Sequence, residues 1–239
     1  MTRHLLHEMT WEELKEKCEG NTPCVIIPIG STEQHGPHLP LGTDTLVAMA
    51  IAEDAGIATG AIVAPPLWYG WSPHHMVLPG TVTIRPEVLI ELLYDVLQSL
   101  SEHGLCKFVL VNGHRIVNVS WMQIAAERAQ RQLGIRVVIF DPAYMSRDIV
   151  EELGFGPVGH AEEIETSQLW FRHPDLYHGE RAIDFVPVQK NLSKVDPRAT
   201  GDPLCYVPST KADMMDSVRG AKGTTGSPTK ASIDKGSVY

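Results

Sequence analysis

The sequence has no cluster of lysine and arginine residues. Acidic residues outnumber basic ones by 29 to 20, which gives a formal net charge of -9. Binding to the phosphate backbone of nucleic acids requires clustered positive charge. We therefore expect no nucleic acid partner and look for a small-molecule substrate instead.

Cysteines are few and long apolar runs are absent. The four cysteines, Cys18, Cys24, Cys106 and Cys205, form no C-x-x-C pair, so we expect buried free thiols in a reducing cytosol rather than disulfides or a zinc ribbon. No window approaches 18 consecutive apolar residues, and the N-terminus lacks the apolar run of a signal peptide. These absences predict a cytoplasmic protein that does not span a membrane.

The 239 residues, 43% of them hydrophobic, are enough to bury a core, and we expect one domain over residues 1–239. Short apolar runs, which predict strands, alternate with amphipathic stretches, which predict helices. The predicted strands are 24–29, 60–65, 107–111 and 135–140, and the predicted helices are 45–58, 86–102, 117–133 and 163–171. This alternation predicts a three-layer α/β/α sandwich with a mainly parallel central sheet. The tail from Val186 onward is rich in Pro, Gly, Ser and Thr, which predicts mostly loop.

Polar side chains follow the first predicted strand, at the sheet edge where α/β proteins place their sites. Glu33 and His35 are two residues apart, so in an extended segment they point to the same side. Asp44 follows after two turns of the chain. Carboxylate and imidazole ligands together suit Zn, Mn or Fe(II). Alternatively, Asp44 caps the helix that begins at Thr45 and His35 is an ordinary loop histidine.

Two further polar clusters follow later in the chain. His114 comes directly after the third predicted strand, where Asn112 and Asn118 could orient metal ligands. The alternative is a plain Asn-Gly turn with an exposed histidine. Near His160, three glutamates lie at the start of a predicted helix. The alternative explanation is structural, because acidic side chains stabilise the positively polarised N-terminus of a helix. The three are Glu162, Glu163 and Glu165.

These motifs, taken in order, resemble the creatininase family. The segment GSTEQHGPHLPLGTDT, residues 30–45, is similar to the family signature almost position for position. NGH at 112–114, SPHHMVLPGT at 72–81, HAEEIETS at 160–167 and GSPTKASIDKG at 226–236 resemble further family segments. The resemblance therefore covers most of the chain and implies a creatininase-like α/β fold. It also implies a homo-oligomer, often a hexamer.

The resemblance implies a site with two divalent metal ions, Zn, Mn or Fe. It assigns Glu33 and His114 to one metal, His35 to the other, and Asp44 to a bridging position. Creatininase itself takes a further ligand from a glutamate two residues after the NGH histidine, where this chain has Ile116. Relatives without that glutamate usually carry one in the HAGE segment, which makes Glu163 the expected fifth ligand.

The reaction implied is the attack of a metal-bound hydroxide on a substrate carbonyl. His160 and Glu163 are the catalytic candidates, with His160 protonating the leaving group. The substrate-binding candidates are His75, Arg115, Ser72 and Trp71.

Three functional hypotheses remain open. Hydrolysis of an amide C–N bond in a small polar, cyclic substrate is favoured. The family also contains hydrolases that open the ring of a cyclic polyol ketone, such as a dehydro-inosose, at a C–C bond. In a different class, the chain would be a metal- or sugar-binding module without turnover, for which Trp68, Tyr69 and Trp71 would supply aromatic platforms.

Overall fold

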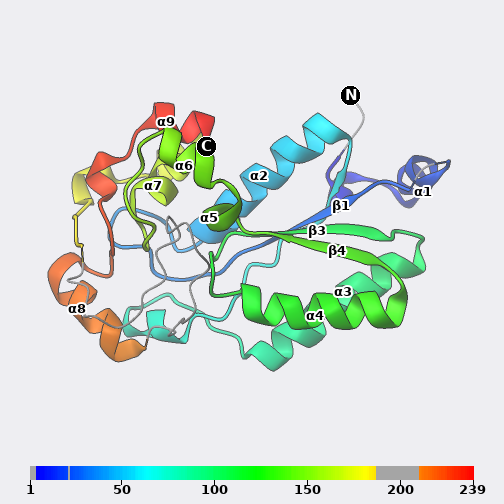
Figure 1. Cartoon of the computed structure of the whole chain (residues 1–239), viewed down its shortest axis with the longest axis horizontal. Helices are drawn as coiled ribbons and strands as arrows, with labels where there is room; N and C mark the ends of the chain where they lie inside the picture. The colour runs from blue at the N-terminus through cyan, green and yellow to red at the C-terminus, as the bar shows by residue number, and fades with distance from the viewer. Residues whose placement is uncertain (1–3, 21, 187–209) are drawn as a thin grey trace. The chain divides into compact units, whose positions relative to one another are not determined.

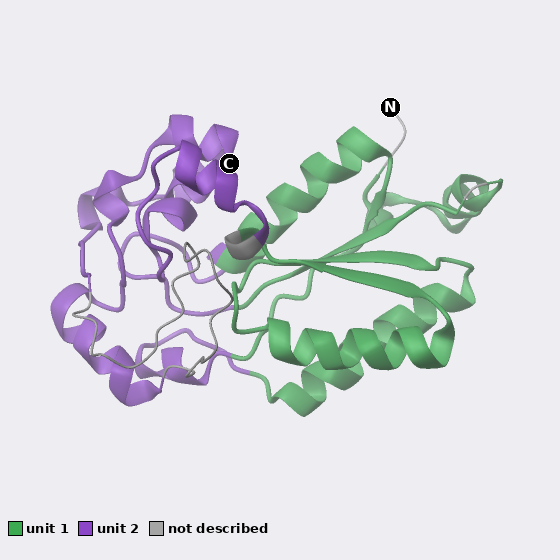
Figure 2. Cartoon of the chain, viewed as in Figure 1, with its two compact units in different colours: residues 1–31, 44–71, 84–142 green, residues 32–43, 72–83, 143–239 purple. Residues whose placement is uncertain are grey.

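The computed structural model describes residues 4–20, 22–186 and 210–239 (Figure 1). The chain divides into two compact units, shown in Figure 2. Unit 1 comprises Met1–Ser31, Asp44–Trp71 and Ile84–Pro142, and unit 2 comprises Thr32–Thr43, Ser72–Thr83 and Ala143–Tyr239. Because the chain crosses repeatedly from one unit to the other, neither unit is contiguous in sequence. The single domain over residues 1–239 stays a prediction.

Unit 1 is built on a parallel sheet. Its strands are β1 (Val25–Ile29), β2 (Ile62–Val63), β3 (Lys107–Asn112) and β4 (Arg136–Phe140), in the order β2-β1-β3-β4. Every neighbouring pair is parallel. β1 is buried along its whole length, as its apolar sequence predicts for a central strand. The strand predictions are confirmed, although β2 is shorter than the stretch 60–65.

Helices cover both faces of this sheet. α3 (Pro86–Glu102) and α4 (Val119–Leu133) pack against one face, where Ile27 of β1 contacts the main core. α2 (Thr43–Thr59) packs against the other face through Ala48 and Ala52, beside Ile26. Successive residues of β1 thus enter opposite cores, as the two-residue period of a strand requires. The predicted three-layer α/β/α arrangement is confirmed (Figure 1).

The remaining helices are shorter. They are η1 (Leu6–Glu8), α1 (Trp11–Cys18), η2 (Pro73–Val77), α5 (Pro142–Met145), α6 (Arg147–Glu152), α7 (Glu163–Arg172), η3 (Pro174–Leu176), η4 (Gly179–Arg181), α8 (Lys211–Ala221), η5 (Pro228–Lys230) and α9 (Ile233–Val238). Within unit 2, α9 packs against α7 and α8 packs against η2. This packing brings the C-terminal segment next to the predicted catalytic helix α7.

Among the described helices that were not predicted from the sequence, α1 and α8 are the longest. Each begins with a capping box, in which the N-cap threonine and an acidic residue three positions later satisfy each other's backbone N–H groups. The pairs are Thr10 with Glu13 and Thr210 with Asp213. α8 also buries Met214. The prediction of mostly loop is therefore wrong for 210–239. The capping box and the burial of Met214 stabilise α8 although the segment is rich in residues that favour loops. Residues 187–209, including Cys205, lie outside the described residues.

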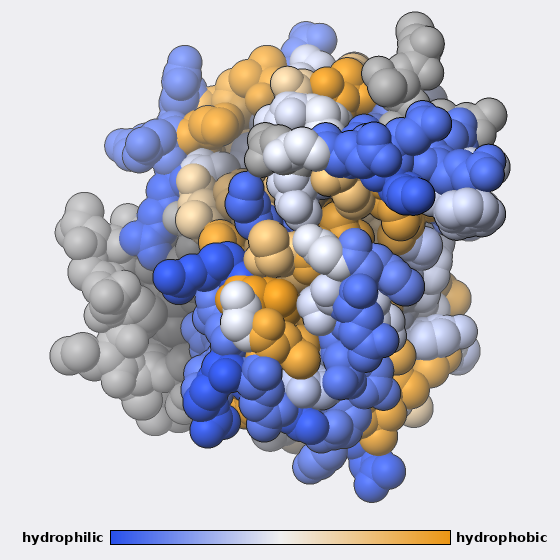
Figure 3. All heavy atoms as spheres, turned by 90° about the vertical axis from the view of Figure 1, so that its right-hand side faces the viewer, coloured by the Kyte–Doolittle hydropathy of each residue, from blue (hydrophilic) through white to orange (hydrophobic). Residues whose placement is uncertain are grey.

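The surface of the described chain is mixed in polarity. Figure 3 shows hydrophobic residues interspersed with hydrophilic ones on the face that it presents. Among the described helices, none is both long enough and apolar enough to cross a membrane. The three described cysteines, Cys18, Cys24 and Cys106, are free. The predicted burial of these thiols is wrong for Cys106, which is exposed just before β3, and Cys18 and Cys24 are only partly buried.

The core of unit 1 offers a matched test of packing on α3. Leu93 is fully buried, whereas its neighbour Leu92 is 45% exposed. We expect Leu93→Ala to lower the free energy of unfolding by about 2–5 kcal/mol, because it removes packed methyl groups and leaves a cavity. Leu92→Ala should cost less than about 1 kcal/mol. Urea denaturation followed by far-UV circular dichroism measures both, and equal losses would contradict the assigned face of α3.

Candidate metal centre

The loop that carries Glu33 and His35 belongs to unit 2 and is held by backbone hydrogen bonds. The N–H of Glu33 donates to the carbonyl of Leu41 at 2.9 Å, and the N–H of Val82 donates to the carbonyl of Thr32 at 2.9 Å. The segments 32–43 and 72–83 therefore lie side by side. The side chains of Glu33 and His35 are both fully buried, which is costly for polar groups that lack a matching partner.

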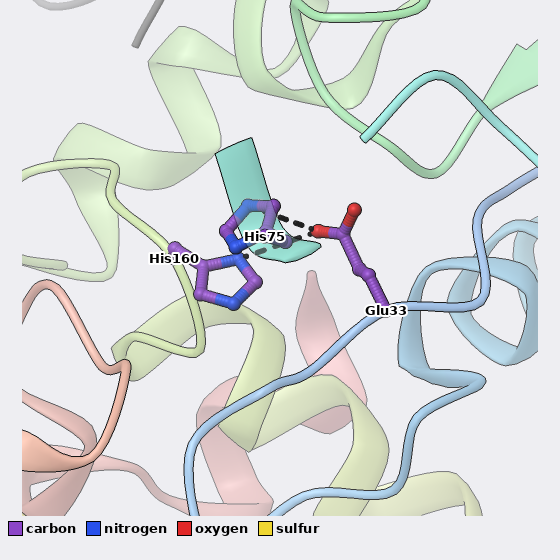
Figure 4. A group of neighbouring side chains, drawn as sticks. All are labelled: Glu33, His75 and His160. Carbon is purple, nitrogen blue, oxygen red and sulfur yellow. Dashed lines mark ion pairs between the residues drawn. The ribbon is translucent and has the colours of Figure 1, made fainter. Parts of the chain in front are cut away.

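Glu33 faces two histidines from distant parts of the chain (Figure 4). Its Oε1 atom lies 3.3 Å from Nε2 of His75 and 3.6 Å from Nδ1 of His160. His75 lies on η2, and His160 lies in the segment before α7, where it pairs with Thr225 in an antiparallel bridge. The two imidazole rings are 4.0 Å apart. The structure thus brings together a predicted ligand, a predicted substrate-binding residue and a predicted catalytic residue.

A carbonyl group of the same loop decides which ring nitrogen of His35 carries the proton. Nδ1 lies 3.1 Å from the carbonyl oxygen of Glu33, and a carbonyl can only accept, so Nδ1 carries the proton. In the neutral ring, Nε2 then presents its lone pair. That atom lies 3.8 Å from Oε2 of Glu165. Pinning one ring nitrogen with a backbone carbonyl is how proteins orient a histidine toward a metal ion.

The two glutamates of the first turn of α7 point in different directions. Glu165 faces His35, and its Oε2 accepts a hydrogen bond from the N–H of Ala161 at 2.7 Å. Glu163 instead pairs with Lys235 at 2.6 Å and accepts from the N–H of Gly156 at 3.0 Å. Residues two apart on a helix are about 200° apart around its axis, which explains the divergence. Glu163 as a ligand stays a prediction, and Glu165 is a second carboxylate with suitable geometry.

In unit 1, the structure pairs the other two predicted ligands. Nδ1 of His114 lies 3.1 Å from Oδ2 of Asp44, and both side chains are buried. Asp44 lies inside the first turn of α2. Gly113 allows this approach, because a Cβ atom there would lie 1.9 Å from the backbone oxygen of Asp44. The glycine of the NGH motif thus permits a close backbone contact as well as a turn.

The two asparagines around His114 hold the loops of unit 1 in place. Asn118 donates to the carbonyl of Gly30 at 3.1 Å and accepts from the indole N–H of Trp121 at 2.9 Å. Asn112 donates to Asp141 at 2.9 Å, and Asp141 also accepts from the N–H of Ile116 at 2.8 Å. Sequence analysis did not single out Asp141, because an acid after a strand carries no distinguishing motif.

The remaining predicted substrate-binding residues lie in different settings. Trp71 is partly buried against the main core of unit 1. Ser72 is buried in unit 2, where its N–H donates to Thr83 at 2.8 Å. Arg115 follows His114 in the turn before α4. Their roles in substrate binding stay predictions.

His38 is a further buried histidine, in the same loop as Glu33 and His35. Its Nε2 lies 3.1 Å from the hydroxyl of Thr166. Burial, with a smaller contribution from the charge of His35, lowers the pKa of His38 to about 4. His38 is therefore neutral at neutral pH.

The fold and these side chains define a class of protein. A parallel α/β sheet with buried carboxylates and imidazoles that converge closely enough to hold a divalent cation is typical of metal-dependent enzymes. Within unit 2, one such group consists of His35, His160 and Glu165.

Comparison with known proteins identifies the family. Residues 7–239 match the family described as "Creatininase: Creatinine amidohydrolase". The chain is 35% identical over 188 residues to the 3-dehydro-scyllo-inosose hydrolase of Thermotoga maritima, an alignment that covers 75% of the chain and 59% of that protein. It is 28% identical over 217 residues to the creatinine amidohydrolase of Pseudomonas putida, covering 82% and 83% of the two chains. The chain belongs to the creatininase family of hydrolases.

Solved structures of creatininase share the fold. A mutant described as the Zn-Zn type matches with a TM-score of 0.78 and 26% identity, over 98% of this chain and 91% of its own. A structure described as "Creatininase Mn" matches with a TM-score of 0.78 and 25% identity, over 98% and 92%. The predicted family and fold are confirmed.

Proposed function

We propose that this protein is a divalent-metal-dependent hydrolase that acts on the carbonyl carbon of a small, polar, cyclic substrate. The observation that carries this proposal is the pair formed by His35 and Glu165. Two buried atoms with lone pairs, Nε2 and Oε2, lie 3.8 Å apart, and a backbone carbonyl holds the proton of the ring on the other nitrogen. A divalent cation near these atoms would be bound by the lone pair of Nε2 and by the negatively charged carboxylate of Glu165.

The proposed ligands of two metal ions are Glu33, His35, Asp44 and His114, with one glutamate of α7 as the fifth. Their burial and their mixture of carboxylate and imidazole fit Zn, Mn or Fe. The zinc and manganese forms of the related creatininase structures support this choice. When bound, such ions lower the pKa of water towards neutrality and polarise a carbonyl group.

The chain's own residues then bind the substrate and move protons. His160, whose Nδ1 lies 3.6 Å from Oε1 of Glu33, is placed to protonate the leaving group. His75, 3.3 Å from Glu33, is placed to donate a hydrogen bond to a substrate oxygen. The low exposure of both side chains, 3% for His75 and 12% for His160, restricts access of bulk water, which strengthens these interactions.

The identity of the fifth ligand can be decided with a matched pair of variants. We expect Glu165→Gln to lower metal affinity by about 10–100-fold, because it removes the carboxylate beside His35. Glu163→Gln should keep the metal, because its carboxylate contacts Lys235. Metal content after dialysis against a chelator, measured by mass spectrometry, compares the two. Metal loss in Glu163→Gln alone would instead assign the role to Glu163.

Two bonds are candidates for cleavage. Cleavage of an amide C–N bond would parallel the creatinine amidohydrolase relative. Opening of a cyclic polyol ketone would parallel the inosose hydrolase relative, whose higher identity of 35% favours this second candidate. Turnover of the zinc- and manganese-loaded protein on creatinine, other cyclic amides, formamides and dehydro-inososes distinguishes them. Tight binding of such compounds without turnover would instead support a non-catalytic binding module.

We also propose that the protein acts in the cytoplasm as a homo-oligomer, a hexamer by resemblance to its family. The free thiols of Cys18, Cys24 and Cys106 are compatible with a reducing compartment. Size-exclusion chromatography with light scattering tests the assembly, and a monomeric mass at micromolar concentration would contradict it.

A further inference from the structure

Gln34 connects the two histidines that face Glu33. It lies between Glu33 and His35 in the loop and is only 3% exposed. Its side-chain amide nitrogen lies 2.9 Å from Nδ1 of His75, and its main-chain carbonyl oxygen lies 2.5 Å from Nε2 of His160. One residue therefore contacts both rings through two different groups.

Backbone groups on either side fix the orientation of the Gln34 amide. Its Oε1 accepts from the N–H of Gly36 at 3.1 Å, and its Nε2 donates to the carbonyl of Gly223 at 3.3 Å. If the amide were rotated by 180°, its NH₂ group would face the N–H of Gly36 and its oxygen would face the carbonyl oxygen of Gly223, and neither hydrogen bond could form. Gly223 has a φ of +101°, and a Cβ atom there would lie 2.1 Å from Oε1, so the position requires glycine.

This orientation decides which nitrogen of His75 carries the proton. The amide N–H of Gln34 donates to Nδ1 of His75, so Nδ1 must present its lone pair. The proton of the neutral ring is then on Nε2, which lies 3.3 Å from Oε1 of Glu33. His75 therefore faces Glu33 as a hydrogen-bond donor.

The same reasoning places the proton of His160. A carbonyl oxygen can only accept, so the contact of 2.5 Å with the carbonyl of Gln34 requires the proton on Nε2 of His160. The amide nitrogen of Gln34 also lies 3.0 Å from this atom, but its two N–H groups are used by His75 and Gly223. The nitrogen of His160 that can exchange a proton is therefore Nδ1, 3.6 Å from Oε1 of Glu33.

We infer that Gln34 is a positioning residue that holds His75 and His160 in the Nε2-protonated form. This inference rests on the proposed function, and it names the atom at which the proton moves. Nδ1 of His160 takes up the proton that the attacking water releases and passes it to the leaving atom of the substrate as the bond between that atom and the carbonyl carbon breaks. The neutral ring that remains keeps its other proton on Nε2, held by the main chain of Gln34.

Nuclear magnetic resonance tests this assignment directly. Two-bond ¹H–¹⁵N spectra of the zinc-loaded full chain, labelled with ¹⁵N-histidine, show which ring nitrogen carries the proton. The signals are assigned by comparison with His75→Gln and His160→Gln. We expect Nε2 protonation in both neutral rings. A neutral His160 or His75 protonated on Nδ1 would overturn the inference, whatever the enzyme hydrolyses.

Gln34→Glu separates the side-chain role from the main-chain role. The carboxylate keeps an acceptor for Gly36 but has no N–H to donate to His75. We expect the proton of His75 to move to Nδ1 while that of His160 stays on Nε2, with zinc content unchanged. On a substrate of the proposed class, kcat should fall about tenfold or more while KM changes little.

A second variant, Gln34→Leu, removes both polar atoms and should give a similar loss of kcat. Unchanged histidine spectra and unchanged kcat in Gln34→Glu would refute the positioning role. If the wild-type protein hydrolyses no substrate of the class, the proposed function fails, whereas the spectra still decide where the protons lie.

Discussion

Glu33→Gln and His114→Ala are each expected to lose bound metal and to reduce hydrolysis by at least about 1000-fold. Each substitution removes one proposed ligand, and metal-activated water and carbonyl polarisation depend on a bound ion. Each variant tests one proposed ligand, Glu33 in unit 2 and His114 in unit 1. Glutamine has nearly the shape of glutamate, so Glu33→Gln should preserve packing.

Elemental analysis measures the bound metal, steady-state kinetics measures hydrolysis, and far-UV circular dichroism checks that each variant is folded. Glu87→Gln and His103→Ala are matched controls, since both residues are exposed on or beside α3 and should keep full metal content. Full turnover by metal-free wild-type protein would refute the metal mechanism. Retention of metal by Glu33→Gln or by His114→Ala would remove that residue from the ligand set.

His160→Ala is expected to keep its metal and to lower kcat by about 100–10,000-fold. A loss of this size is the usual contribution of one imidazole that acts as a general acid. His160 lies beside Glu33, and its Nε2 is held by a main-chain carbonyl, so it is positioned for proton transfer. The exposed His178, whose side chain is 49% exposed, provides a control, and His178→Ala should behave like the wild-type protein.

Metal content again decides between the two roles open to His160. The ring also lies in a group with His35 and Glu165 that could hold a cation. If His160→Ala loses metal together with activity, His160 is a ligand and its assignment as the acid is wrong. If it keeps both metal and kcat, another group donates the proton.

Much of the fold could be predicted from the sequence because its signals are local. The apolar run before Glu33 forms β1, and the stretch from Pro86 to Glu102 forms α3 with the predicted bounds. The start of α4 was predicted two residues too early, at Val117 instead of Val119. Ile116 has a φ of +69° in the turn before this helix, and a residue other than glycine gives no sequence signal for that conformation.

The motif loops were also predictable, but not the directions of their side chains. Glu33, His35, Asp44 and His114 were found from their order and their position after strands. The choice between Glu163 and Glu165 depends on the phase of α7 and on the place of Lys235 in the C-terminal segment. Neither is a local property of the HAEEIETS motif.

By itself, the sequence determined the alternation of strands and helices, the family, and the loops that carry the polar side chains. These depend on residues near one another in the chain, whose periodicity and turn chemistry act locally. Only the tertiary structure decided that Gln34 joins His75 and His160, and that Gly223 fixes its amide. Contacts between such distant positions form only when the chain packs, because packing sets the direction in which each hydrogen bond can form.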